Sequence, residues 1–281
     1  MFQEKILEKS FLLIALSSIS ILTLIAFFIF QQGIPLIWKV GLNSFLLGDR
    51  WFPSKESFGI FPMIVGSFWV TLGSLIVGVP LGVACAVFLC ELTTPTIAMF
   101  LRPMIQLLAA IPSVIYGFWG LIVLVPFIRD SLGGPGLSIL AGSLVLGIMI
   151  LPTIISISED SLRALPRTYK EGALSLGATH WQTIWRVLLP AARSGIVASI
   201  ILGMGRAIGE TMAMIMILGN AAQLPHSILD SARTLTTNIG IEMGYATGDH
   251  RQALFATGVV LFFIIVILNS LALFISRKGR G

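Results

Sequence analysis

The sequence predicts an all-α membrane protein, a polytopic bundle of six transmembrane helices. Of its 281 residues, 56% are hydrophobic and 11% are charged, whereas an average soluble domain has roughly 45–50% and about 25%. A helix needs about 20 apolar residues to cross the hydrocarbon core of a bilayer. Six stretches meet that requirement with few or no charges: Phe11–Phe30, Pro62–Cys90, Pro103–Ile128, Gly136–Ile157, Gly195–Ala222 and Ala253–Ser276.

The first stretch is predicted to be a retained helix rather than a cleaved signal peptide, because no small-residue cleavage site follows it. It belongs to an N-terminal region, residues 1–62, whose outer loop is rich in aromatic residues, among them Trp51, Phe52 and Phe58. Such residues are typical of the membrane interface and also of surfaces that bind proteins. The sequence leaves both interpretations open.

Basic residues predict the orientation of the helices, because cytoplasmic loops carry an excess of Lys and Arg. Eleven of the eighteen basic residues fall on the side that holds both termini and the loop 158–193, six fall on the other side, and Arg206 falls inside a predicted helix. Both termini and this loop are therefore predicted to be cytoplasmic. The net charge of +5 follows from this asymmetry and requires no nucleic acid as a partner.

Pro112 predicts a break or kink in the third stretch, and the next residue, Ser113, would place its hydroxyl and free backbone amides toward a transport path. The alternative is ordinary packing of a kinked helix. In the second stretch, Cys85 and Cys90 lie on different helix faces. They are predicted to be packing residues rather than a disulfide or a metal site.

The loop 158–193, between the fourth and fifth stretches, is predicted to contain a helix, a glycine turn and a second helix. Pro166 suits the first turn of a helix, and Gly177 suits the left-handed residue that ends it. A charged, folded loop on the cytoplasmic side is suited to bind a soluble partner. The alternative is a pair of helices on the membrane surface, with their basic residues against lipid headgroups.

The second helix of this loop begins at a capping-box pattern formed by Thr179 and Gln182. Pro190 predicts that the helix ends at Leu189. Apolar side chains recur along it at positions i, i+3, i+4 and i+7, which predicts a single apolar stripe. The stripe consists of Trp181, Ile184, Trp185 and Leu188.

The fifth stretch holds two ionisable residues at membrane depth, Arg206 and Glu210. Arg206 lies eleven residues beyond Gly195, roughly 16 Å along a helix, and a charge near the middle of a bilayer costs about 2.5–3.5 kcal/mol or more. Glu210 would follow one turn later on the same face. This pair is predicted to face another helix or a wet cavity rather than lipid.

Two interpretations of this pair stay open. Arg206 and Glu210 would form a structural ion pair, or the guanidinium would bind a tetrahedral oxyanion through its planar fork of donors. Phosphate carries about −1.5 to −2 charges near neutral pH, so a second arginine from a partner subunit would be needed. Thr211 and Asn220 are further candidates for the same path, with packing as the alternative.

The loop 158–193 resembles the coupling loop of type I ABC importer permeases, whose pattern is E-A-A-x-x-x-G followed by I-x-L-P. The triplet Glu171-Gly172-Ala173 departs from the pattern only at its middle residue. The resemblance implies the fold of these permeases and a coupling helix that binds a separate ATPase subunit. ATP and Mg²⁺ would bind there, so this chain needs no cofactor and is not an enzyme. The implied coupling residues are Glu171, Gly172, Ala173, Gly177, Leu188 and Pro190.

The segment Gly205–Asn220 resembles the fifth span of phosphate ABC transporter permeases of the PstC type, as do Trp51–Pro53, Phe58–Pro62 and Ile111–Gly117. The resemblance implies a bacterial inner-membrane permease whose core is residues 63–281. It also implies a heterodimer with a PstA-type permease, a PstB-type ATPase dimer and a periplasmic phosphate-binding protein. Arg206 and Glu210 match the conserved Arg and Glu of that family.

Three other functions are considered. A permease for another oxyanion, such as sulfate or molybdate, or the PstA-type partner itself, would share most of these features. A proton-coupled carrier would use Glu210 as a relay, but it would not need a folded loop that binds an ATPase. An intramembrane hydrolase would need a nucleophile with a His or a second carboxylate at membrane depth, and no His lies inside a predicted span.

Overall fold

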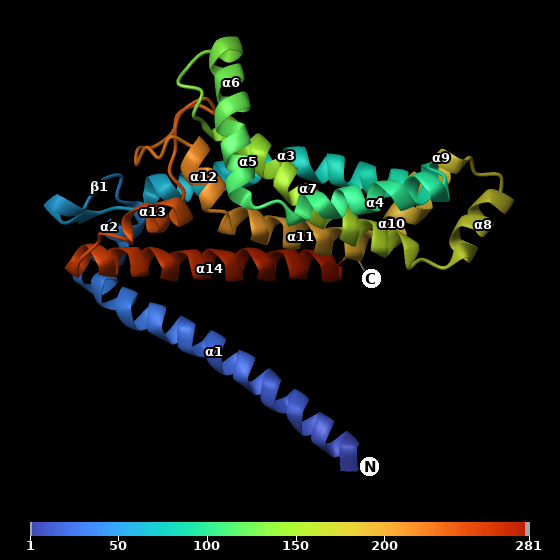
Figure 1. Ribbon diagram of the computed structural model, residues 1–281, viewed down its shortest axis with the longest axis horizontal. Helices are drawn as coiled ribbons and strands as arrows, with labels where there is room; N and C mark the ends of the chain where they lie inside the picture. The colour runs from blue at the N-terminus through green and yellow to red at the C-terminus, as the bar shows by residue number, and fades with distance from the viewer. Residues whose placement is uncertain (1, 279–281) are drawn as a thin grey trace.

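The computed structural model describes residues 2–278, and most of them are helical (Figure 1). Four long helices lie side by side: α3 (Phe61–Val87), α7 (Ile139–Arg163), α11 (Arg193–Gly209) and α14 (Gly248–Lys278). The C-terminal part of α1 (Phe2–Val40) packs against α14, and the N-terminal half of α1 leaves the bundle. Arg280, which belongs to the predicted basic C-terminal flank, lies outside the described residues.

The centre of the bundle is the contact between α3 and α7. Two glycines of α3 allow the close approach: a Cβ on Gly78 would lie 2.8 Å from the Ile150 side chain, and one on Gly82 would lie 2.6 Å from that of Ile154. Both isoleucines are fully buried. Small residues at such contacts are typical of membrane helix pairs, which gain packing energy rather than hydrophobic burial.

The predicted spans agree with the structure for the most part. Among residues 2–278, five helices are long and apolar enough to cross a membrane, and a sixth is possible if the bent pair His180–Ala191 and Arg193–Gly209 forms one span. The second, fourth and sixth predicted stretches are confirmed as α3, α7 and α14, respectively. α3 continues into the π-helical turn η2 (Phe88–Leu92). The first stretch is confirmed as a helix and is longer than predicted, because α1 extends to Val40.

The third predicted stretch, Pro103–Ile128, is wrong as a single span. Its residues belong to α4 (Pro95–Ala110) and then to α5 (Ser113–Trp119), η3 (Gly120–Leu124) and α6 (Val125–Leu132). The helix stops at Ile111 because Pro112 disfavours helical backbone in the residue before it. The segment that is apolar and long enough to cross a membrane is Ser113–Leu132, and α6 points away from the bundle (Figure 1).

The end of the bundle opposite α8 is built from short elements. The chain continues from α1 through α2 (Leu42–Leu47) into an antiparallel pair, β1 (Trp51–Phe52) and β2 (Ser57–Phe58), joined by η1 (Pro53–Lys55). Trp51 and Phe58 are buried in a core cluster with residues of α1 and α14, whereas Phe52 is exposed. Both the membrane-interface and the protein-binding interpretation are therefore wrong for Trp51 and Phe58, and both stay open for Phe52.

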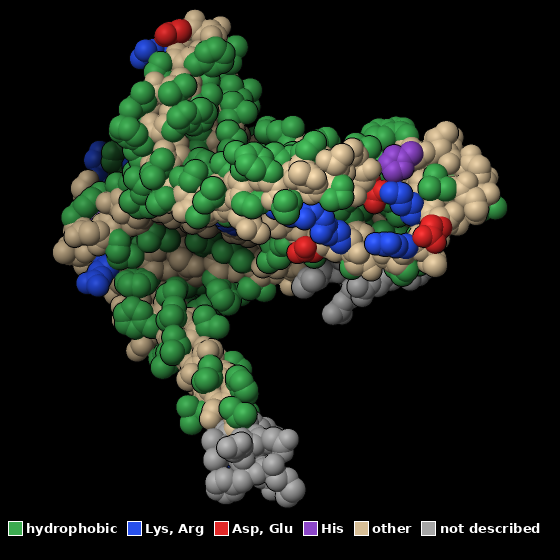
Figure 2. Space-filling view, turned by 45° about the vertical axis from the view of Figure 1, so that its right-hand side comes forward, with side chains coloured by type: hydrophobic (Ala, Val, Ile, Leu, Met, Phe, Trp, Pro, Cys, Tyr) green, Lys and Arg blue, Asp and Glu red, His purple; other side chains and the backbone are tan. Residues whose placement is uncertain are grey.

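The surface in Figure 2 is mostly hydrophobic or neutral along the helices, and many of its charged side chains gather near the end that carries α8 and α9. α8 (Arg167–Ser175), α9 (His180–Thr183), η4 (Ile184–Leu188) and α10 (Leu189–Ala191) connect α7 to α11. The start of α1 and the end of α14 point toward this same end (Figure 1).

Candidate functional site: a helical loop and a broken helix

The loop between α7 and α11 contains the predicted helix, glycine turn and helix. Gly177 has φ +83°, the left-handed conformation that ends α8. The Thr179 hydroxyl accepts a hydrogen bond from the Gln182 backbone N–H, and the Gln182 side chain accepts one from the Thr179 N–H. The capping box is confirmed. The predicted end at Leu189 is wrong by two residues, because the helix continues to Ala191. Pro190 lies in the first turn of α10, where the backbone N–H that proline lacks is not required.

The predicted apolar stripe is split into a buried and an exposed pair. Ile184 and Leu188 are buried against the ends of α3 and α7, whereas Trp181 and Trp185 are each 57% exposed. The two tryptophan rings pack edge to face with their centroids 5.7 Å apart. The π-helical turn η4 begins at Ile184, so the regular helical spacing assumed for the stripe does not hold there.

α8 and the turn after it present three of the sequence-predicted coupling residues on an open surface. Pro190 is exposed on α10, whereas Ala173 is half-buried and Leu188 is buried. Glu171, Gly172 and Gly177 are exposed, and a Cβ on either glycine would meet nothing within 4 Å. The loop is anchored to the end of η2 through Glu91: Lys170 Nζ lies 2.6 Å from its carboxylate, and His180 Nε2 lies 3.1 Å from its backbone oxygen. The α8 surface is therefore free, and its base is attached to the bundle.

The fifth predicted stretch is broken three residues after Arg206, so the predicted arrangement of Arg206 and Glu210 on one helical face is wrong. α11 ends at Gly209, Glu210 is extended (φ −69°, ψ 127°), and α12 (Met212–Ile217) begins two residues later. The Glu210 carboxylate accepts a hydrogen bond from the Ala213 backbone N–H at 3.1 Å. It satisfies a donor that the new helix start leaves without a partner.

Arg206 lies in the last turn of α11 and donates from Nη1 to the Thr153 hydroxyl of α7 at 3.4 Å. Both residues are half-buried. Within the described part of the chain, the Arg206 and Glu210 side chains form no ion pair. The Glu210 carboxylate therefore accepts no hydrogen bond from the Arg206 guanidinium among the described contacts.

α5 and α13 (Leu235–Glu242) flank the break. α5, which starts at Ser113, packs on α12, and a Cβ on Gly117 would lie 2.8 Å from Ala213 Cα. From α13, the Thr236 hydroxyl donates to the Glu210 backbone oxygen at 3.0 Å. Thr211 lies within the break and its methyl group faces Gly240 of α13.

Asn220 has a local role in the turn that follows α12. Its backbone is left-handed (φ +55°), a conformation that Asn tolerates better than most residues. Its side-chain amide donates to the Ile215 oxygen at 2.7 Å, and its backbone oxygen accepts a hydrogen bond from Arg233 Nε. These contacts place it in the support of the outer loop and not beside Arg206.

Sequence reasoning missed a cluster around the buried carboxylate of Glu242. This carboxylate accepts hydrogen bonds from Trp51 Nε1 at 2.8 Å and from Arg233 Nη1 at 2.6 Å, and it lies 2.7 Å from His250 Nε2. The three partners come from β1, from the segment before α13 and from α14. Partial desolvation raises the pKa of the nearby Tyr245 hydroxyl, and the negative charge of Glu242 raises it further.

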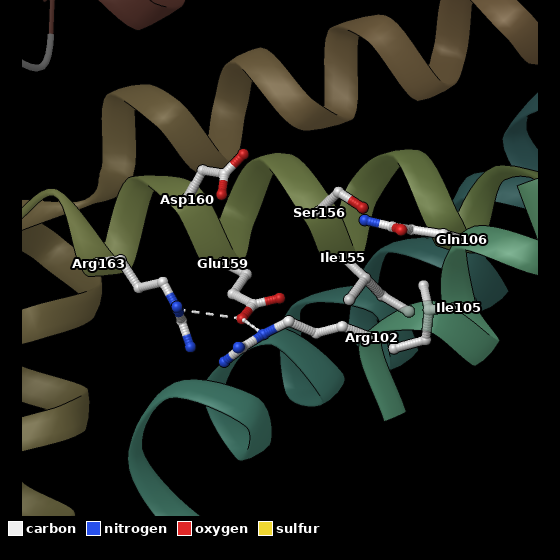
Figure 3. Close-up of a pocket in the computed structure, with 8 residues that line it drawn as sticks. All are labelled: Arg102, Ile105, Gln106, Ile155, Ser156, Glu159, Asp160 and Arg163. Carbon is white, nitrogen blue, oxygen red and sulfur yellow. Dashed lines mark hydrogen bonds and ion pairs between the residues drawn. The ribbon is translucent and has the colours of Figure 1, made fainter. Parts of the chain in front are cut away.

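A second cluster that the sequence did not reveal lies between α4 and α7 near the α8 end (Figure 3). The Glu159 carboxylate is 9% exposed, and its Oε1 lies 2.7 Å from Arg102 Nε and 3.0 Å from Arg163 Nε. Glu159 and Arg163 are four residues apart on α7, a spacing that predicts an ion pair. Nothing in the sequence indicates that Arg102 joins them, because α4 is a separate helix.

Residues 78–281 match the model of a protein family described as binding-protein-dependent transport system inner membrane component. A Bacillus subtilis protein, "Probable ABC transporter permease protein YqgH", is 42% identical over 95% of this chain and 88% of its own length. The "Phosphate transport system permease protein PstC" of Haemophilus influenzae is 38% identical over 85% of this chain and 83% of its own length.

Solved structures support the same fold. A bacterial ABC transporter that imports the polysaccharide alginate matches with a TM-score of 0.64 over 99% of both chains at 17% identity. The inward-facing methionine transporter MetNI matches with a TM-score of 0.59 over 79% of this chain and 94% of its own, at 21% identity. The chain therefore has a known overall fold, and it is a member of the family of inner-membrane components of binding-protein-dependent transport systems.

Proposed function

We propose that this chain is the PstC-type permease subunit of an ATP-driven importer of inorganic phosphate. It is a multi-pass protein of the inner membrane and carries no catalytic centre of its own, because ATP is hydrolysed by a separate subunit. The observation that carries the proposal is the anchored helical loop, with Glu171 and Gly177 in a family motif on its free surface. The names of the relatives support phosphate as the substrate.

The partners follow from this assignment. α8 would bind one subunit of a PstB-type ATPase dimer, which places α8 and both termini in the cytoplasm. The outer loops at the other end would bind a periplasmic phosphate-binding protein. A PstA-type permease would complete a heterodimer and supply the second arginine that a doubly charged anion requires.

In the proposed path, Arg206 binds the phosphate oxygens, and Glu210 and Thr211 lie next to it in the break. Arg206 suits this role because it is half-buried and its guanidinium makes one long contact, to Thr153. The negative charge of Glu210 weakens the binding, which helps the anion to leave. Ser113 lies at the start of α5 beside α12. Asn220 supports the turn that follows α12.

The test is ATP-driven phosphate uptake into proteoliposomes that contain the complete importer and the binding protein. Arg206→Gln is expected to reduce uptake by about a hundredfold or more, because charge-assisted contacts to the anion are lost, while assembly of the complex is retained. Lys9→Gln is the control, since that lysine is exposed in the half of α1 that leaves the bundle, away from the outer loops. Uptake that needs a proton gradient and no ATP would contradict the importer assignment, and loss of the assembled complex in Arg206→Gln would contradict the role of Arg206.

A further inference from the structure

We propose that Arg102 and Arg163, held by Glu159, form a second site for a phosphate group, at the α8 end of the molecule. The site is a cavity of about 140 Å³ between α4 and α7. Figure 3 shows the two arginines and Glu159 on one side of α7 and Asp160 on the other. The ligand is either free phosphate or the phosphodiester of an anionic lipid, and both present the same oxyanion.

The arrangement of the two guanidiniums carries this inference. Both use Nε to contact the same oxygen, Oε1 of Glu159, at 2.7 and 3.0 Å. Their four terminal nitrogens make no hydrogen bond to any of the described residues. One carboxylate thus holds two like charges side by side, and the trio keeps a net charge of +1 with a set of unused donors. Asp160 also lines the cavity, so its four charged side chains sum to zero, and the unused arginine donors rather than an excess of positive charge would hold the anion.

A phosphate group meets these requirements. Its oxygens accept several hydrogen bonds at once and match the planar fork of arginine, and its negative charge relieves the repulsion between the two guanidiniums. Glu159 is 9% exposed, whereas Arg102 and Arg163 are 32% and 48% exposed. The carboxylate is therefore the buried base of the site, and the arginines form its open mouth.

The position of the cavity relates it to Arg206. Thr153, which contacts Arg206, lies on α7 six residues before Glu159, a separation of about 9 Å along the helix. Ser156 of α7 and Gln106 of α4 also line the cavity. If the ligand is free phosphate, the site is where the transported anion pauses after Arg206, and this assignment rests on the proposed function.

The experiment uses the complete importer without nucleotide or binding protein, in nanodiscs of phosphatidylcholine. The ³¹P line width of added inorganic phosphate reports binding, and all samples carry Arg206→Gln so that the proposed path residue does not contribute. Adding Arg102→Gln and Arg163→Gln together is expected to weaken binding by about tenfold or more, because charge-assisted hydrogen bonds are lost. The matched control is Arg129→Gln with Arg251→Gln, which removes the same charge at exposed positions elsewhere.

Lipid as the source of the phosphate group is tested in nanodiscs that also contain phosphatidylglycerol. The amount of this lipid that stays with the complex after detergent extraction is then expected to fall in the double variant and not in the control. Each single variant leaves one arginine paired with Glu159, so the single variants replace the double variant in both measurements if the double variant does not assemble. Equal phosphate binding and equal lipid retention in all variants would overturn the proposal. Uptake by the wild-type importer, measured separately, tests the proposed function and is independent of this result.

Discussion

Replacing Glu242 with Gln is expected to destabilise the end of the bundle opposite α8. The Glu242 side chain is 8% exposed, and its two oxygens serve Arg233, Trp51 and His250. Glutamine has nearly the same shape, so the substitution leaves no cavity. It removes the negative charge, and its amide group places a donor against side chains that are themselves donors.

The size of the effect follows from the burial of Arg233. That guanidinium is 15% exposed and loses its charge partner at 2.6 Å. Breaking a buried ion pair by removing one partner costs about 3–5 kcal/mol. A loss of 1 kcal/mol lowers the melting temperature by about 2–4 °C for chains of 150–250 residues, so the apparent melting temperature is expected to fall by about 6–20 °C.

The assay is thermal unfolding of the purified protein in detergent, followed by intrinsic fluorescence. Glu56→Gln is the matched control, because Glu56 lies in the same outer region and is exposed. Replacing Arg233 with Met in the Glu242→Gln background should restore part of the lost stability, since the unpaired charge is then gone. A melting temperature for Glu242→Gln within about 1 °C of the Glu56→Gln value would refute the reasoning that this cluster supports the fold.

Two pairs of glycine substitutions test the packing and the loop. Gly177→Ala is expected to destabilise the loop by about 1–2 kcal/mol, because its φ of +83° is unfavourable for other residues. Gly172→Ala in the exposed helix α8 is expected to stabilise the loop by up to about 1 kcal/mol. Limited proteolysis of the loop measures both effects, and equal protease sensitivity of the two variants would contradict the turn assignment. Gly82→Ala is expected to lower the melting temperature by several degrees, because the added carbon would lie 2.6 Å from Ile154. Gly205→Ala, where a Cβ meets nothing within 4 Å, is the control, and an equal effect of both would argue against tight α3–α7 packing.

Local patterns predicted local structure well. Charge-free length identified α3, α7 and α14, because a bilayer demands a continuous apolar stretch from each spanning helix. The capping box at Thr179 and the left-handed Gly177 depend on residues a few positions apart, so the sequence was sufficient for them. The family motif then assigned a function to the loop that these residues build.

The candidate site was harder to predict, because its geometry depends on distant contacts. The stretch from Gly195 to Ala222 is mostly apolar on both sides of Glu210, and its hydropathy gives no sign that the helix stops at Gly209. The end of the helix depends on two contacts of Glu210: its backbone oxygen accepts a hydrogen bond from Thr236 of α13, and its carboxylate accepts one from the Ala213 N–H. The Glu242 cluster joins residues up to 191 positions apart, and no periodicity in the sequence reports such a contact.

The break beside Arg206 is stable only because other segments satisfy its backbone. Irregular backbone at membrane depth needs partners from the protein itself, and the Thr236 hydroxyl supplies one for the Glu210 oxygen. Thr236 lies on α13, whose last residue, Glu242, is bound to Trp51 and His250. The outer loops therefore hold the segment that carries Glu210 in place. A change that releases α13 from Glu242 should loosen this segment, and so the Glu242→Gln variant is also expected to show faster hydrogen exchange at the amides of residues 210–212.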